Sequence, residues 1–183
     1  LEQEDWDKLM EGTTRMMEAP LLIDDRSAVT PNYIRKVIRQ AKKEYPALGL
    51  VIVDYVQLMQ SNIRNPSREQ EISEISRTMK AIAKEFSLPM VVLSQLNRGL
   101  ERRTEKRPMM SDLRESGALE QDADLIFFIY RDEVYNEDTE DKGIAEISIA
   151  KHRNGEIGMK RLAFIGQYTK FANLALGAGD SST

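Results

Sequence analysis

The side chain best placed for chemistry is a carboxylate that directly follows an apolar run. Residues 50–53, Leu-Val-Ile-Val, are uninterrupted apolar residues, and Asp54 comes next. A run that is apolar on both faces is typical of a strand in the middle of a parallel sheet covered by helices. Open α/β sheets bind ligands at the carboxyl ends of such strands, and nucleotide hydrolases place there an acid that holds the magnesium ion of the triphosphate. Asp54 is therefore either a metal ligand or an ordinary cap of the following turn.

A second apolar run ends in a pair of neutral polar residues. Residues 90–93 are apolar, and Ser94 and Gln95 follow them. Between the two runs, Ser67 can cap a helix that continues to about Phe86, with apolar residues at helical spacing. A strand, a helix and a strand in this order predict a right-handed crossover and a parallel pair. Gln95 thus ends the strand that neighbours the Asp54 strand, either as a functional amide or as a plain polar strand end.

Two cations precede a predicted hairpin near the carboxyl end. Residues 144–149 alternate with a period of about two, and Asn154-Gly155 is a strong turn signal. Lys151 and Arg153 are two positions apart on this strand, so both should point to the same side. Taken alone, they are solvated hairpin charges.

The remaining pattern predicts the elements that position these residues. Residues 5–19 predict a helix, residues 21–23 a short buried strand, Thr30 with Pro31 the start of another helix, and residues 125–130 a third apolar strand. The apolar face of the first helix, expected to lie in the core, consists of Trp6, Leu9, Met10, Thr13 and Met17. The fold class that follows is α/β: a mostly parallel sheet flanked by helices, with a carboxyl-terminal antiparallel hairpin.

Composition narrows the function classes. The chain of 183 residues suits one domain, and no apolar run approaches the roughly 20 residues needed to span a bilayer. It has no cysteine, which excludes disulfides and thiolate metal sites and fits a reducing, cytoplasmic location. The single His152 cannot form a histidine metal cluster. Because the formal net charge is −4, any nucleic-acid binding must come from local basic patches.

Five stretches in one order resemble the RecA-type motor domain of bacterial replicative DNA helicases, the DnaB family. They are IVDYVQLM (52–59), SQLNR (94–98), DLRESG (112–117), QDAD (121–124) and KHRNG (151–155). The similarity extends from about Asp5 to Asn173. The family forms a homohexameric ring that encircles single-stranded DNA and moves along it by hydrolysing nucleotide. The resemblance implies ATP and Mg²⁺ as cofactors, a RecA-like fold, and primase and a helicase loader as further partners.

The resemblance also implies roles for the residues singled out above. Asp54 matches the Walker B aspartate that holds magnesium directly or through water, and Gln95 matches the position that senses the γ-phosphate. Lys151 and Arg153 match the pair that reaches from one subunit into the nucleotide site of the next, where an arginine stabilises charge on the transferred phosphoryl group.

DNA contacts are implied for the two irregular loops after Asp54 and after Gln95, which match the family's central-pore loops. Arg114, Glu115 and Gly117 match the segment that touches the phosphate backbone, to which a glycine gives close access. Arg64 and Arg68, in the polar loop after Asp54, either add salt-sensitive attraction to DNA or are solvated loop charges.

One part of the motor is missing from the chain. A nucleoside triphosphatase of this class needs a phosphate-cradling loop that ends in Gly-Lys-Ser/Thr, and the sequence contains no Gly-Lys dipeptide. The family's catalytic glutamate also belongs to an earlier strand. We therefore expect residues 1–175 to form a partial motor domain, truncated on its amino-terminal side, and residues 176–183 to form a flexible tail. By itself the chain should show no ATPase activity above that of an Asp54→Ala control.

The function expected is that of part of an ATP-dependent replicative DNA helicase that unwinds duplex at the replication fork. A non-catalytic RecA-like module that binds DNA or a partner is the alternative, favoured by the missing phosphate loop. The retained Asp54, Lys151 and Arg153 oppose it, because none of them is needed without nucleotide. A recombinase or circadian-type member of the superfamily is a third possibility, less well matched by residues 112–117 and 151–155.

Overall fold

The computed structural model describes residues 2–64 and 66–174, with the backbone alone for residues 114–116. The described helices and strands are α1 (Gln3–Glu18), α2 (Pro31–Glu44), β1 (Val51–Val53), α3 (Arg68–Phe86), β2 (Met90–Val92), α4 (Gly117–Asp122), β3 (Leu125–Tyr130), β4 (Ile144–His152), β5 (Gly158–Ile165) and β6 (Lys170–Asn173). The predicted tail at 176–183 lies outside the described residues. None of the helices in the described ranges is long and apolar enough to cross a bilayer.

The two helices next to β1 and β2 begin at the residues that the sequence predicts. The Thr30 hydroxyl accepts a hydrogen bond from the Tyr33 amide at the start of α2. At α3, Ser67 and Gln70 cap each other reciprocally, so two amides that the helix leaves without partners are satisfied. The helix ends at Ser87, which adopts the left-handed conformation.

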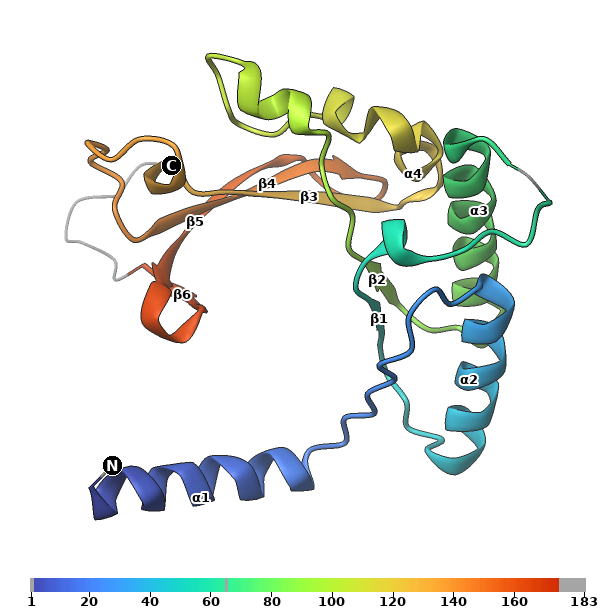
Figure 1. Ribbon diagram of the computed structural model, residues 1–183, viewed down its shortest axis with the longest axis horizontal. Helices are drawn as coiled ribbons and strands as arrows, with labels where there is room; N and C mark the ends of the chain where they lie inside the picture. The colour runs from blue at the N-terminus through green and yellow to red at the C-terminus, as the bar shows by residue number, and fades with distance from the viewer. Residues whose placement is uncertain (1, 65, 175–183) are drawn as a thin grey trace.

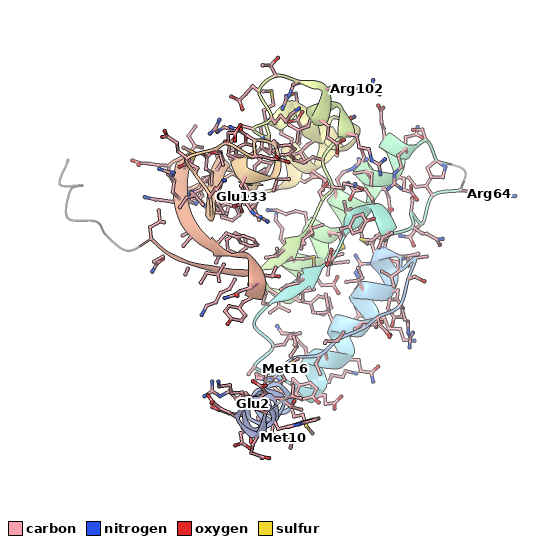
Figure 2. All side chains as sticks on the ribbon, turned by 60° about the vertical axis from the view of Figure 1, so that its left-hand side comes forward. Glu2, Met10, Met16, Arg64, Arg102 and Glu133 are labelled. Carbon is pink, nitrogen blue, oxygen red and sulfur yellow. The ribbon has the colours of Figure 1, made fainter. Side chains whose placement is uncertain are left out.

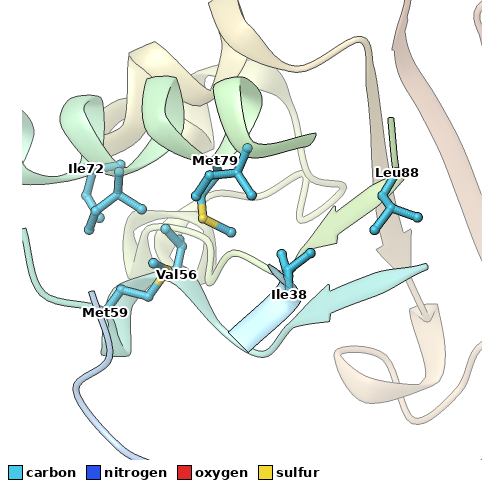
Figure 3. Packing of buried hydrophobic residues seen from close by; sticks show 8 residues of the cluster. Ile38, Val56, Met59, Ile72, Met79 and Leu88 are labelled. Atoms are coloured by element: carbon cyan, nitrogen blue, oxygen red, sulfur yellow. The ribbon is translucent and has the colours of Figure 1, made fainter. Parts of the chain in front are cut away.

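The predicted strand–helix–strand unit is confirmed. β1 and β2 are parallel, with Val53 level with Val92. Helices α2 and α3 cover one face of this pair, and their buried side chains form the main core together with residues of the segments that follow β1 and α3 (Figures 1 and 3). The core consists of Ile38, Val56, Met59, Ile72, Ile75, Met79, Ile82 and Leu88.

The prediction of a mostly parallel sheet is wrong. The only parallel pair among the described residues is β1–β2, whereas β3, β4, β5 and β6 form a separate four-stranded antiparallel sheet in that order. A parallel neighbour needs a long crossover, usually a helix. The connection from β3 to β4, residues 131–143, contains only a single 3-10 turn, so the chain returns antiparallel beside β3. The predicted hairpin at Asn154-Gly155 joins β4 to β5.

The predicted burial of the amino-terminal segment is also wrong. Helix α1 forms, but it has no buried residue, and Figure 1 shows it projecting away from both sheets. Trp6 is 50% exposed and Met17 82% exposed. Residues 21–23 form no strand. Helical spacing shows which side of a helix is apolar, but it does not show what covers that side.

The second face of the parallel pair is open as well. Ile52 is 60% exposed and Val91 is 48% exposed, although the unbroken apolar run predicts cover on both faces. In β3, Leu125, Phe127 and Ile129 are likewise exposed, while the alternating residues are buried.

The contrast between the two faces gives a prediction about stability. Replacing the fully buried Ile75 with alanine is expected to lower the free energy of unfolding by about 2–5 kcal/mol, since it removes buried carbon and leaves a cavity. Ile52→Ala is the matched control, with an expected change within about 0.5 kcal/mol at an exposed site. Denaturant unfolding of both variants measures the difference, and equal losses would contradict the described core.

Candidate functional site

Asp54 and Gln95 lie at the same edge of the parallel pair. Because Val53 is level with Val92, the chain leaves both strands at one end. The Val56 amide donates to the Leu93 carbonyl at 2.9 Å, which extends the contact beyond the strands. Asp54 and Gln95 are both exposed. The two strands are neighbours as predicted, but β2 ends at Val92, so Gln95 lies three residues beyond its end.

Gln57 joins the two strand ends directly. Its side-chain amide donates to the Gln95 carbonyl at 3.1 Å and to the Ser94 hydroxyl at 3.0 Å, and its carbonyl oxygen accepts from the Gln95 amide at 3.1 Å. The side chain therefore fixes the backbone on both sides of Gln95. Sequence reasoning gave Gln57 no role, and the available signal was a single amide inside the apolar stretch Val56-Gln57-Leu58-Met59.

A cleft of about 310 Å³ begins at this bridge. It is lined by Gln57, Gln95, Leu96, Asn97, Arg98, Asp112 and Leu113. The cleft therefore connects the edge that carries Gln95 with the irregular segment that follows it. Neither Arg64 nor Arg68 is among the residues that line the cleft.

The charged segment after Gln95 is a compact loop, which we call the 97–112 loop. Asp112, only 8% exposed, closes it: its carboxylate accepts from Arg103 Nη2 at 2.9 Å and from the Met109 amide at 2.8 Å. The Asn97 amide donates to the Asp112 carbonyl at 3.0 Å. Lys106 donates to two carbonyls of the same loop. Some of its cations therefore hold the loop in shape, while Arg102 lies on its exposed surface (Figure 2).

The segment proposed to touch DNA follows the 97–112 loop. Arg114 and Glu115 belong to a 3-10 stretch, Met110–Ser116, and their side chains lie outside the described residues. This stretch runs into α4 at Gly117. A Cβ atom added at Gly117 would meet no atom within 4 Å. The chain's own packing therefore does not require a glycine here, and the open space leaves the backbone accessible to a ligand.

Lys151 and Arg153 both contact the carboxyl end of α4. Lys151 Nζ donates to the Glu120 carbonyl at 2.5 Å and to the Gln121 carbonyl at 3.3 Å, and Arg153 Nη2 donates to the Gln121 carbonyl at 2.9 Å. Cations suit the negative end of a helix. The prediction that the two side chains lie on one side is confirmed, and both remain partly exposed.

Asp124 completes the surroundings of Arg153. Arg153 Nη1 lies 3.4 Å from Asp124 Oδ1, and the Arg153 amide donates to the Asp124 carbonyl. A hydrogen bond from Lys80, assisted by the charges of Lys80 and Arg153, lowers the pKa of Asp124 from its ordinary value. Arg153 therefore faces an ionised carboxylate within its own chain.

The two loop arginines differ in their surroundings. Arg68 donates to the Gln57 carbonyl at 3.0 Å and pairs with Glu71, so it supports the residue that bridges the strand ends. Arg64 projects outward from its loop (Figure 2).

The residues present fit a magnesium ion that is shared with a nucleotide. Among the described residues no three acids or histidines gather into a self-sufficient metal site. Mg²⁺ bound with a triphosphate needs only one or two carboxylates, because phosphate oxygens and water complete its shell. Asp54, an exposed carboxylate at the end of a strand, meets that requirement.

Comparison with known proteins identifies relatives along nearly the whole chain. The family model described as "DnaB-like helicase C terminal domain" matches residues 1–173. The chain is 55% identical over 176 residues to the replicative DNA helicase DnaB of Pasteurella multocida, covering 96% of this chain and 38% of that protein. It is 50% identical over 175 residues to DnaB of Geobacillus stearothermophilus, covering 95% and 38%.

Two solved structures share the fold. One, described as an ATPase domain, superposes with a TM-score of 0.92 at 45% identity, covering 94% of this chain and 61% of that one. A DnaB-like replicative helicase, solved with its interactions with primase, gives 0.92 at 45% identity, with 96% and 43% covered. The chain spans 38% of the length of the two curated relatives named above.

Proposed function

Because the chain belongs to the family of DnaB-like helicase C-terminal domains, we propose that it forms part of the motor of a ring-shaped, ATP-dependent replicative DNA helicase. The observation that carries the proposal is the placement of Asp54 and Gln95 at one edge, where the Gln57 side chain holds the Gln95 backbone. This is where a parallel pair presents groups to a bound nucleotide. Residues 1–175 are the proposed motor segment, in the cytoplasm.

The nucleotide site uses groups from two subunits. Asp54 holds the Mg²⁺ that accompanies ATP, an ion that neutralises charge on the β- and γ-phosphates. The Gln95 side chain can donate to the γ-phosphate oxygens and accept from water beside them. Because Gln57 fixes the backbone on both sides of Gln95, a change at this side chain when phosphate leaves is transmitted to the 97–112 loop. Lys151 and Arg153 act on the nucleotide of the adjoining subunit in a homohexamer, which requires them to exchange the α4 carbonyls for phosphate oxygens.

DNA is the second ligand. Arg114, Glu115 and Gly117 are proposed to contact the phosphate backbone of single-stranded DNA, and the open space at Gly117 supports close approach. Arg64 and Arg68 add charge on the loop after Asp54. Primase and a helicase loader are proposed partners, the first in keeping with the helicase solved with its primase interactions.

The test places the chain in a complete motor. In a chimera, this chain replaces the matching 176 residues of the Pasteurella multocida helicase. ATP hydrolysis is expected with ATP and Mg²⁺, and it should increase with single-stranded DNA, while the isolated chain should release no phosphate. A folded hexameric chimera without turnover would instead favour a non-catalytic module.

A further inference from the structure

One charge pair joins the 97–112 loop to the antiparallel sheet. Arg107 Nε donates to Glu146 Oε2 at 2.8 Å, and Arg107 Nη2 donates to Glu146 Oε1 at 2.9 Å. This two-pronged geometry fixes the direction as well as the distance of the contact. Glu146 belongs to β4, so residues 39 positions apart are fastened together.

The surroundings shield the carboxylate member of this pair from water. The Glu146 side chain is only 9% exposed, and the Arg107 guanidinium lies 4.9 Å from the centre of the Tyr130 ring. Tyr130 is level with Glu146 in the β3–β4 register and stacks on Tyr135 at 5.7 Å. The hydrogen bonds from Arg107 lower the pKa of Glu146, so this carboxylate stays ionised at neutral pH. Removing Arg107 would leave the buried Glu146 carboxylate without its partner. The Arg107 side chain is itself 45% exposed and also lies 3.5 Å from Glu105.

Strand β4 connects this contact with the proposed trans-acting cations. Lys151 follows Glu146 by five residues on the same strand, about 16 Å at roughly 3.3 Å per residue. Beyond it, Arg153 reaches the end of α4. The loop that begins at the Gln95 edge is therefore tied to the strand that carries Lys151 by this charge pair. Apolar packing adds to the tie, because Met110 of the loop and Ala150 of β4 pack against the same buried cluster.

We propose that the Arg107–Glu146 pair is a latch that positions the 97–112 loop on β4 and so couples DNA contact at the adjoining residues 114–117 to the action of Lys151 and Arg153. Arg107 is a positioning residue in this scheme, because its guanidinium is engaged by Glu146 and Tyr130. The inference rests on the proposed function.

The first measurement detects the latch independently of helicase activity. Hydrogen exchange is followed in the chimera for peptides covering residues 97–112. Arg107→Gln and Glu146→Gln are each expected to accelerate exchange in these peptides, while Arg102→Gln, a change at an exposed arginine of the same loop, leaves it unchanged. Unaltered exchange in both latch variants would overturn the proposal even if the chimera is an active helicase.

The second measurement tests coupling. The ratio of ATP turnover with and without single-stranded DNA is expected to fall about tenfold in either latch variant, within the usual range for coupling between two sites. The double variant Arg107→Gln/Glu146→Gln should lose no more than either single variant, because both remove the same interaction. The reversed pair, Arg107→Glu/Glu146→Arg, should recover part of the ratio.

The outcomes distinguish a failure of the latch from a failure of the proposed helicase function. Additive losses, or a ratio equal to that of the unaltered chimera, would overturn the latch. Absence of any DNA stimulation in the unaltered chimera would count against the proposed function instead. Thermal unfolding and gel filtration of each variant show whether a loss reflects coupling or a failure to fold and assemble.

Discussion

Replacing Arg153 with alanine is expected to lower ATP turnover of the chimera by about 10³-fold or more, the contribution of an arginine that stabilises phosphoryl charge from a neighbouring subunit. Nucleotide binding and ring assembly should persist, because Arg153 acts on the transferred group. The measurement is steady-state phosphate release beside gel filtration and nucleotide titration.

A control is needed because Arg153 also contacts its own chain. Asp124→Asn removes the charged partner of Arg153 while leaving the arginine in place. This variant should retain most of the turnover if phosphate contact is the role of Arg153. Comparable losses in the two variants would mean that Arg153 only anchors the segment around α4.

Mixed rings test whether Arg153 acts between subunits. Subunits with Arg153→Ala keep an intact Asp54, and subunits with Asp54→Ala keep an intact Arg153. Neither preparation should turn over alone, but mixing them should restore measurable activity at junctions that combine both intact groups. No recovery in mixed rings of confirmed composition would contradict action in trans.

Replacing Asp54 with asparagine is expected to lower Mg²⁺-dependent turnover by about 10²–10³-fold, equivalent to losing a few kcal/mol of metal-assisted charge stabilisation. The amide keeps the shape of the side chain and removes the charge that attracts the ion. The increase in nucleotide affinity on adding Mg²⁺ should therefore shrink in the variant. Asp25→Asn, at an exposed aspartate before α2, is the matched control and should change neither quantity. Full activity of the Asp54 variant would exclude Asp54 as the metal ligand.

Local patterns were enough to place the chemistry-bearing residues on their elements. The apolar runs before Asp54 and Gln95 predict strands, and the capping residues Thr30 and Ser67 mark where two helices begin. These signals act over a few residues, so they are readable without knowing the fold. The parallel pairing of the two strands followed from the helix between them.

Contacts between residues far apart in the chain could not be predicted from the sequence. Gln57 and Gln95 are 38 positions apart, and nothing local marks one amide as the partner of the other. The arginines of the 97–112 loop look alike in the sequence, yet Arg103 is held by Asp112 and Arg107 by Glu146. Whether a charged side chain is solvated or buried depends on what the fold brings opposite it.

The sequence by itself determined the family, the strand–helix–strand order around α3, and the place of Asp54 directly after a strand, because motifs, periodicity and capping are properties of neighbouring residues. Only the tertiary structure decided that β3 joins an antiparallel sheet and that the apolar faces of α1 and β1 are uncovered. The physical reason is that an apolar face shows a tendency to be buried, whereas burial itself requires a partner surface, and that surface comes from residues far away along the chain.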